Sequence, residues 1–324
     1  MKKALIIIGI ALGVILVALV AAGFYIVNAN LAMEHRGQDI EGSYKEMKGY
    51  YPEMIPWLDS LQKTGGLKDS TLLRDGDTKV HYYYAFAPQH TGKTAVVCHG
   101  YTDNAIRMFM IARIYNQVLG YNIIVPDMPH AGNSEPNHIS MGYYESQIAR
   151  KLAASAQNIF GDDTTKVEIV VHGISMGAAT TMMTVGDDNV NKDLNIKCAV
   201  EDCGYTSCWD EFSQEITNSY GIPPFPLLYV ADLVCDIKNG WCFHDASPLE
   251  AVKNTSLPIF FIHGDNDDFV PTSHVYMNYD AKVKGYKEIW LAPGSAHAMA
   301  YKDHPAEYTA HVRSFLAKVR ELGL

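Results

Sequence analysis

The sequence predicts an α/β fold in which a mostly parallel central sheet carries helices on both faces. From about residue 94 onward, short apolar runs of strand length alternate with longer segments of helical periodicity. One apolar run, residues 169–171, ends at His172 and leads into Gly173-Ile174-Ser175-Met176-Gly177, and small residues come after it. A buried strand, a tight turn and a helix are therefore expected around Ser175, and the rest of the chain is arranged about this unit.

The other elements are predicted by the same alternation. The expected strands span 94–98, 121–126, 196–202, 257–262 and 288–291. Helices are expected at 105–119 and 143–160, and a last one starts after Asp303, with Pro305 in its first turn. Apolar residues on this last helix recur at helical spacing and predict one buried face, made of Tyr308, Val312, Phe315, Leu316 and Val319. An Asp75-Gly76 pair between 67–74 and 79–87 predicts a β-hairpin.

The N-terminus differs from the rest of the chain. Residues 4–27 contain no charged side chain, and about 20 apolar residues suffice to cross a bilayer. Lys2 and Lys3 precede this run and should stay in the cytoplasm, so residues 1–28 are expected to anchor the chain with everything after Asn28 outside. A signal peptide cleaved near residues 27–29 is the alternative, and it would release a secreted protein.

The composition of the chain limits its class and its partners. The 324 residues are 48% hydrophobic and 19% charged, with a net charge of −10, and no basic stripe suggests a nucleic-acid partner. Residues 29–44 are polar and are interpreted as a stalk, and residues 45–324 as one catalytic domain.

A segment rich in aromatic residues and proline interrupts the alternation at about 204–248. It lies between two expected strands, where an ordinary crossover would be far shorter. We interpret it as a cap over the site, the alternative being a helical decoration that does not touch substrate. In an exported domain, disulfides could join Cys235 to Cys242 or Cys203 to Cys208. No spacing of cysteine and histidine resembles a metal site.

Three candidate residues for chemistry come after three strands in chain order. A serine hydroxyl becomes a nucleophile when a base removes its proton and an acid orients that base. Ser175 comes after the first of these strands, an acid loop at 263–271 after the second, and His297 after the third. Spacing alone leaves the acid open among Asp265, Asp267 and Asp268, with Asp202, at the end of another strand, as a further candidate.

The tetrahedral intermediate of acyl transfer also needs hydrogen-bond donors for its oxyanion. The backbone N–H of Met176, directly after the nucleophile, is one expected donor. The other is expected from the loop at 99–104, where Gly100 lets the chain turn and Tyr101 N–H can point to the site.

Together these motifs resemble the α/β-hydrolase superfamily, and within it the bacterial membrane-anchored or secreted esterases and lipases of the cinnamoyl-esterase-like branch. The resemblance covers about residues 45–322 and rests on the segments 99–101, 126–134, 173–177 and 264–271 and on His297. The family pattern Gly-(Asp/Glu)-x-Asp-x-x-Val implies that Asp267 is the acid. The chain departs from the family at 129–134, where Pro-His-Ala-Gly-Asn-Ser replaces Arg-Gly-His-Gly-x-Ser, a loop that is chiefly structural in the family.

The expected function is hydrolysis of carboxylic esters through an acyl-enzyme, with Ser175, Asp267 and His297 as the triad and with apolar acyl or aryl groups as substrate. The partners implied are a small-molecule ester and, through the N-terminal segment, a membrane; no metal or organic cofactor is needed. One alternative is a peptidase or amidase of the prolyl-oligopeptidase type, although those enzymes typically carry a further propeller domain that a chain of this length is too short to hold. The others are acyl transfer to an alcohol and a non-catalytic surface protein on a hydrolase scaffold.

Overall fold

The computed structural model describes residues 2–76 and 78–323, apart from the side chains of residues 219 and 220. Its centre is an eight-stranded sheet in the order β1-β2-β4-β3-β5-β6-β7-β8. The strands are β1 Lys68–Leu73, β2 Lys79–Ala85, β3 Lys93–Cys98, β4 Asn122–Pro126, β5 Glu168–Ile174, β6 Ile196–Asp202, β7 Ile259–Gly264 and β8 Lys287–Ala292. Only the hairpin β1–β2 and its pairing with β4 are antiparallel, and the other neighbours are parallel. The expected α/β fold and each expected strand are confirmed.

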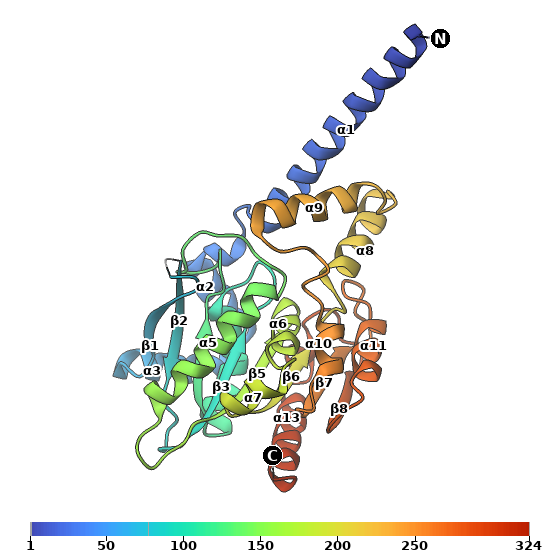
Figure 1. Cartoon of the computed structure of the whole chain (residues 1–324). Coiled ribbons are helices and arrows are strands. Elements are labelled where there is room, and N and C mark those ends of the chain that lie inside the picture. Colours follow the sequence, from blue (N-terminus) through green and yellow to red (C-terminus); the bar gives the residue numbers. More distant parts are fainter. Residues whose placement is uncertain (1, 77, 324) are drawn as a thin grey trace.

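Helices connect the parallel strands and cover both faces of the sheet (Figure 1). Before and between the first strands lie α1 Lys2–Leu31, η1 Arg36–Gln38, α2 Ile40–Tyr50, η2 Pro52–Met54, α3 Ile55–Thr64, η3 Ala105–Met108, α4 Phe109–Arg113 and η4 Ile114–Val118. The later helices are α5 Tyr143–Phe160, α6 Met176–Thr184, α7 Asp188–Asp193, α8 Cys208–Tyr220, α9 Leu227–Asn239, α10 Pro248–Asn254, α11 Ser273–Ala281, α12 Ala300–Asp303 and α13 Pro305–Glu321.

Two of the expected helices differ in detail from the prediction. The helix expected at 105–119 is divided into a 3₁₀ turn, one α-helical turn and one π turn. The last helix is preceded by the short α12, which ends at Asp303, so His304 rather than Asp303 is the residue before its first turn. Its predicted apolar face is buried at all five positions.

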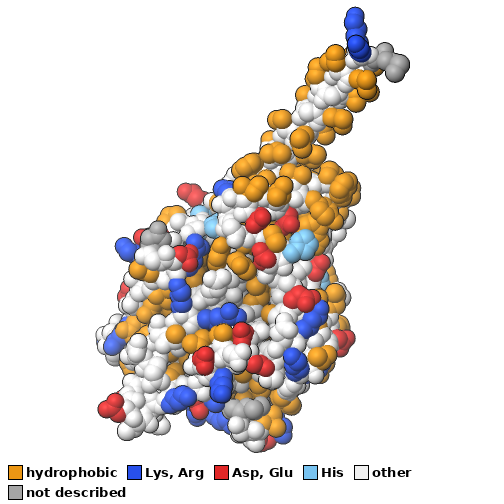
Figure 2. Space-filling model, viewed as in Figure 1, with side chains coloured by type: hydrophobic (Ala, Val, Ile, Leu, Met, Phe, Trp, Pro, Cys, Tyr) orange, Lys and Arg blue, Asp and Glu red, His pale blue; other side chains and the backbone are white. Residues whose placement is uncertain are grey.

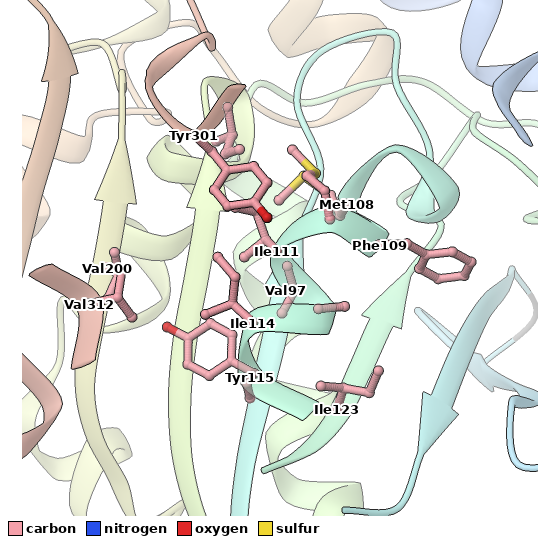
Figure 3. Close-up of a cluster of buried hydrophobic side chains, with 14 of the residues drawn as sticks. Val97, Met108, Phe109, Ile111, Ile114, Tyr115, Ile123, Val200, Tyr301 and Val312 are labelled. Atoms are coloured by element: carbon pink, nitrogen blue, oxygen red, sulfur yellow. The ribbon is translucent and has the colours of Figure 1, made fainter. Parts of the chain in front are cut away.

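Alternating side chains divide the core into two layers. In β3, Ala95 and Val97 belong to one cluster of buried side chains, whereas Val96 and Cys98 belong to the other. The first cluster packs under α3, α4, α12 and α13, and Figure 3 shows part of it, with side chains from the strands, α4, α12 and α13 converging. The second packs under α5, α6, α10 and α11. Apolar burial on both faces thus fixes the sheet, and with it the strand ends that carry the candidate site.

The segment 29–44, which we interpreted as a stalk, forms hydrogen bonds to the body of the molecule. Gly37 and Ser43 are buried, and Asn104 donates from its amide to the carbonyl of Gly37 at 3.0 Å and to the hydroxyl of Ser43 at 2.9 Å. Gly132 N–H also donates to the Gly37 carbonyl at 2.8 Å. The polar composition therefore reflects hydrogen bonds to the loops after β3 and β4, because those loops need partners at the sheet edge.

The cap segment 204–248 contains α8 and α9. Its aromatic residues Trp241 and Phe243 are fully buried in a third cluster, which also includes Met176, Val270 and the end of α1. The helix α9 crosses α1 near the body of the molecule, while the rest of α1 projects away from it (Figure 1). All six cysteines are free, so neither of the disulfides considered from the sequence is present.

Candidate active site

The turn between β5 and α6 holds Ser175 in a backbone conformation that few residues other than glycine adopt. Its φ is 58° and its ψ is −119°. Close packing enforces the turn, because a Cβ on Gly173 would lie 2.0 Å from the carbonyl oxygen of Gly177. A Cβ on Gly177 would lie 2.2 Å from the carbonyl oxygen of Cys98. The glycines are therefore required by the space between β3, β5 and α6.

Ser175, His297 and Asp267 form a continuous hydrogen-bonded chain. The Oγ atom of Ser175 lies 2.9 Å from His297 Nε2, and His297 Nδ1 lies 2.8 Å from Asp267 Oδ2. Ser175 comes after β5, Asp267 after β7 and His297 after β8. The three groups meet because parallel strands end at the same edge of the sheet.

The surroundings of Asp267 keep its carboxylate ionised. The side chain is fully buried, and its Oδ1 accepts from the N–H groups of Phe269 at 3.0 Å and Val270 at 2.9 Å. Burial by itself would raise the pKa of Asp267, but hydrogen bonds from His263 and His297 and the charges of both rings hold that pKa well below its usual range. An ionised carboxylate requires a proton on His297 Nδ1, which leaves Nε2 free to accept the proton of Ser175.

His263, at the start of the acid loop, also lies beside Asp267. Its Nε2 lies 2.8 Å from the Val270 carbonyl oxygen and 3.2 Å from Asp267 Oδ2. The ring therefore holds the acid loop while also approaching the carboxylate. Its place at the end of β7, four residues before Asp267, was the available signal.

The two expected oxyanion donors are backbone amides in the loop after β3 and at the start of α6. Among the described residues, neither Met176 N–H nor Tyr101 N–H has a hydrogen-bond acceptor. Gly100 brings the second loop close, because a Cβ at that position would lie 3.5 Å from Ser175 Cβ. His99 fixes the loop by donating from Nδ1 to the Gly100 carbonyl at 2.8 Å while its Nε2 accepts from Met128 N–H at 2.8 Å.

Asp202 takes part in a different buried chain. Its Oδ2 accepts from the Tyr308 hydroxyl at 3.0 Å, and that hydroxyl lies 2.9 Å from His172 Nε2. The other ring nitrogen of His172 lies 3.0 Å from the Tyr115 hydroxyl, and burial lowers the pKa of His172 to about 3. Burial likewise raises the pKa of Asp202 to about 6. The structure therefore brings Asp267, and not Asp202, to the ring of His297.

The remaining acid candidates and the loop at 129–134 also have their places. Asp265 accepts from Gly294 N–H at 2.5 Å and fastens two loops together, and no contact joins Asp268 to His297 among the described residues. Asn133, in the loop 129–134, donates from its N–H to the buried Asp127 carboxylate at 3.0 Å. Asp127 also accepts from Ala105 N–H at 2.8 Å. That arrangement agrees with a structural role for the loop.

A pocket of about 280 Å³ opens beside His297. Its apolar lining includes Met47, Met108, Met110 and Ile174, and Tyr50 and Tyr51 at the end of α2 also line it. Arg36 and Arg107 also line it but are paired, at 2.7 Å with Asp103 and at 2.6 Å with Glu46 respectively. None of its described lining residues belongs to the cap, so the segment before residue 52 contributes a wall that sequence analysis missed.

Two groups of described residues have the spacing of metal ligands. The first group is Cys203, Asp267 and His297, but Asp267 and His297 are hydrogen-bonded to each other. Burial raises the pKa of the Cys203 thiol well above its usual range. A protonated thiol is a poor ligand. The second, Asp232, Cys242 and His244, lies in the cap.

The cap reaches the candidate site through the acid loop. Gln214 on α8 donates to the Phe269 carbonyl at 3.2 Å, and the Phe269 ring packs on His297 with 4.9 Å between centroids. Tyr101 and Val270 also pack against the cap cluster. The cap thus touches the loop of Asp267 and the loop of Tyr101, and Phe269 of the first loop packs on His297.

Comparisons with known proteins agree with this architecture. The model of the prolyl oligopeptidase family matches residues 147–322, more than half of the chain. The chain is 26% identical over 322 residues to YqkD of Bacillus subtilis, and the match covers 99% of each chain. An esterase of Pyrococcus furiosus is similar in structure, with a TM-score of 0.62 and 19% identity over 78% of this chain and 92% of that one. A membrane phospholipase A matches over 99% of both chains, with a TM-score of 0.54 and 14% identity.

Proposed function

Since the chain belongs to the prolyl oligopeptidase family, within the α/β hydrolases, we propose that it is a serine hydrolase that cleaves carboxylic esters through an acyl-enzyme. The observation that carries this proposal is the series of hydrogen bonds from Ser175 through His297 to Asp267. Ser175 Oγ lies 2.9 Å from His297 Nε2, and His297 Nδ1 lies 2.8 Å from Asp267 Oδ2. These are the contacts that a nucleophile, a base and an orienting acid require.

In the first half of the reaction, His297 Nε2 takes the hydroxyl proton while Ser175 Oγ attacks the ester carbonyl carbon. The carbonyl oxygen becomes an oxyanion, which the free amides of Met176 and Tyr101 stabilise. Collapse of the intermediate breaks the bond to the alcohol oxygen, and His297 returns the proton to that leaving group. Asp267 stabilises the ring of His297 while it is charged.

In the second half, water loses a proton to His297 and attacks the acyl-enzyme carbonyl. The second oxyanion occupies the same two amides, and its collapse releases the acid and regenerates the Ser175 hydroxyl. Every proton passes through one ring nitrogen, so the proposed chemistry needs no cofactor.

For the substrate, we propose an apolar acyl or aryl group. The methionines that line the pocket beside His297 support it, since apolar side chains are typical of sites that hold such groups. Of the three lysine and arginine residues that line this pocket, Arg36 and Arg107 are paired with Asp103 and Glu46, and Lys302 lies over the Tyr50 ring.

We further propose that α1 is a retained membrane anchor with the catalytic domain outside the cytoplasm. The helix is long and apolar enough to span a bilayer, and residues 4–20 are exposed or half-exposed in the folded chain. A retained helix is also supported by the burial of Val27 and Leu31 in the cap cluster. Cleavage at 27–29 would remove Val27 from that cluster.

A peptidase or amidase is the second candidate, and the family match favours it. Both reactions use the same nucleophile and oxyanion stabilisation, but amide cleavage depends more on protonation of a poor leaving group.

The test compares kcat/KM of the full-length protein, in detergent, on acetyl, decanoyl and aryl esters and on matched anilides. Phosphatidylcholine belongs in the panel. We expect esters to exceed anilides, and Ser175→Ala to lower turnover by at least about a thousandfold. Ser155→Ala, on an exposed turn of α5, is the matched control and should retain activity. Faster anilide cleavage would assign a peptidase, and no turnover together with no reaction of Ser175 with a fluorophosphonate would leave a non-catalytic scaffold.

A further inference from the structure

A stripe of exposed apolar side chains runs along α9 and begins at Phe225, two residues before the helix. Phe225, Tyr229, Leu233 and Ile237 succeed one another at intervals of four residues, and they are 70%, 55%, 57% and 76% exposed. Residues four apart lie on the same face of a helix. Figure 2 shows hydrophobic side chains gathered over the cap and continuing onto α1.

The stripe is not the side of α9 that builds the protein core. The opposite side, with Leu228, Ala231, Val234 and Cys235, is buried against the cap cluster. A surface helix in water normally turns a polar side outward. Here the exposed charges on the last turn are Asp236 and Lys238, next to Ile237. Most of the outward side is apolar, and its exposure to water is unfavourable.

The position of α1 indicates the medium that covers this stripe. Twenty residues from Leu5 to Phe24 span about 30 Å, the thickness of a bilayer core. The outer bilayer surface then lies near Phe24. At the adjacent Gly23 the two helices touch so closely that a Cβ would lie 3.1 Å from Val230 Cγ1 and 3.3 Å from Ala231 N. The contact therefore holds α9 at the level of the membrane surface.

The edge of the sheet that carries the candidate site lies next to the end of α1. Ile139 N–H, after β4, donates to the Leu31 carbonyl at 2.8 Å, and the hydroxyl of Tyr101, after β3, donates to the Asn30 carbonyl at 2.5 Å. Lys238 at the end of α9 donates to the Asn28 side chain. The end of α1 thus joins the cap to the loops after two central strands.

From this geometry we propose that the stripe Phe225, Tyr229, Leu233 and Ile237 inserts into the outer surface of the bilayer that α1 crosses, so that the cap is a second membrane contact. The occupant is lipid because the stripe continues the apolar surface of α1 and lies at the level where α1 leaves the bilayer. The substrate class that this placement favours is an amphiphilic ester dissolved in that bilayer. The membrane contact rests on the proposed anchor. Only the substrate class rests on the proposed esterase activity.

The test uses the full-length chain in vesicles of phosphatidylcholine and phosphatidylglycerol. An environment-sensitive dye on Leu233→Cys reports on the stripe, and the same dye on Val283→Cys is the control. Val283 is a similarly exposed apolar residue, at 77%, but it precedes β8 and so lies at the opposite edge of the sheet. The background from native thiols is measured on the unsubstituted chain.

Lipids with a nitroxide on the acyl chain should quench the dye at 233 several-fold more than the dye at 283. Equal quenching at the two positions would overturn the proposal. Self-quenching between dyes at 233 without quenching by lipid would assign the stripe to a second copy of the chain and would also overturn it. Neither result needs turnover, so Ser175→Ala must give the same values even if the proposed activity fails.

A second variant tests the consequence for substrate. Leu233→Gln combined with Ile237→Gln should lower hydrolysis of a vesicle-dissolved ester about tenfold, since two apolar side chains lose their contact with lipid. Hydrolysis of a soluble acetyl ester should stay within about twofold of the unsubstituted protein. Equal loss on both substrates would contradict a role in reaching the bilayer.

Discussion

The hydroxyl of Tyr101 donates to the backbone carbonyl of Asn30 at 2.5 Å, which joins the loop of one candidate oxyanion donor to the last turn of α1. The side chain of Tyr101 therefore connects the N-terminal helix to the candidate active site. Burial raises the pKa of Tyr101, so its hydroxyl keeps its proton for this bond.

Removal of that bond should loosen the loop without removing the amide. We expect Tyr101→Phe to destabilise the chain by about 1–2 kcal/mol, since the Asn30 carbonyl loses its partner. The fall in kcat/KM should be less than about tenfold, because the Tyr101 N–H remains. Thermal unfolding and ester turnover measure the two effects. Tyr276→Phe, at a half-exposed tyrosine, is the control, and an unchanged melting temperature for Tyr101→Phe would contradict the connection.

The acid that orients His297 can be identified by exchanging each carboxylate for an amide. Asp267→Asn should lower kcat about 10³–10⁴-fold, because an amide neither holds the required tautomer nor stabilises the charged ring. Asp202→Asn should retain activity within about tenfold, since Asp202 bonds to Tyr308 instead. Steady-state ester kinetics on both variants measure this, and the reverse ranking would reassign the acid.

The same Asp202→Asn variant makes a prediction about stability and pH. Burial raises the pKa of Asp202 from 3.8 to about 6, so the folded chain holds this proton more tightly than the unfolded chain. The favourable contribution of Asp202 is complete only below pH 3.8 and is lost as the pH rises through about 6.

A pKa raised by about two units corresponds to about 3 kcal/mol of lost stability once the carboxylate is ionised. An amide carries no charge at any pH and avoids this loss. We therefore expect Asp202→Asn to stabilise the chain by up to about 3 kcal/mol at about pH 7.5 and by less at about pH 4.5. Urea unfolding at the two pH values measures the difference. A gain that does not change with pH would mean that the carboxylate is not neutralised in the fold.

The turn around Ser175 should not tolerate a methyl group. Gly177→Ala places a Cβ 2.2 Å from the Cys98 carbonyl oxygen, and the backbone must move to relieve the clash, so we expect little folded or active protein. Gly49→Ala is the matched control, because nothing lies within 4 Å of that position in α2. It should stabilise the chain by about 0.5–1 kcal/mol. Yield and melting temperature compare the two, and a stable, active Gly177→Ala would disprove the packing argument.

Much of the fold could be predicted because burial leaves a local record in the sequence. A strand buried on both faces, such as β5, contains a short apolar run, here residues 169–171, and a helix such as α13 shows apolar residues at helical spacing. The glycines around Ser175 likewise indicated a tight turn. The hydrogen bonds of segment 29–44 could not be foreseen, because polar residues that bond to a neighbouring loop look the same in sequence as polar residues in water.

The candidate site was predictable in part. The order of Ser175, the acid loop and His297 along the chain came from the residues, and the choice of Asp267 came from a family resemblance. The pocket wall at Met47 could not be foreseen, since it depends on where α2 packs relative to His297. The free state of all six cysteines was equally beyond reach, because a disulfide depends on a distance that spacing does not give.

By itself, the sequence determined the alternating strands and helices, the glycine-bounded turn at Ser175 and the apolar helix at the N-terminus. These are local properties, set by side-chain burial and backbone freedom over a few residues. Only the tertiary structure decided that Asp267 rather than Asp202 reaches His297, and that the apolar stripe of α9 lies outward beside α1. Both depend on distances between segments far apart in the chain, which are fixed when the sheet order and the helix packing bring them together.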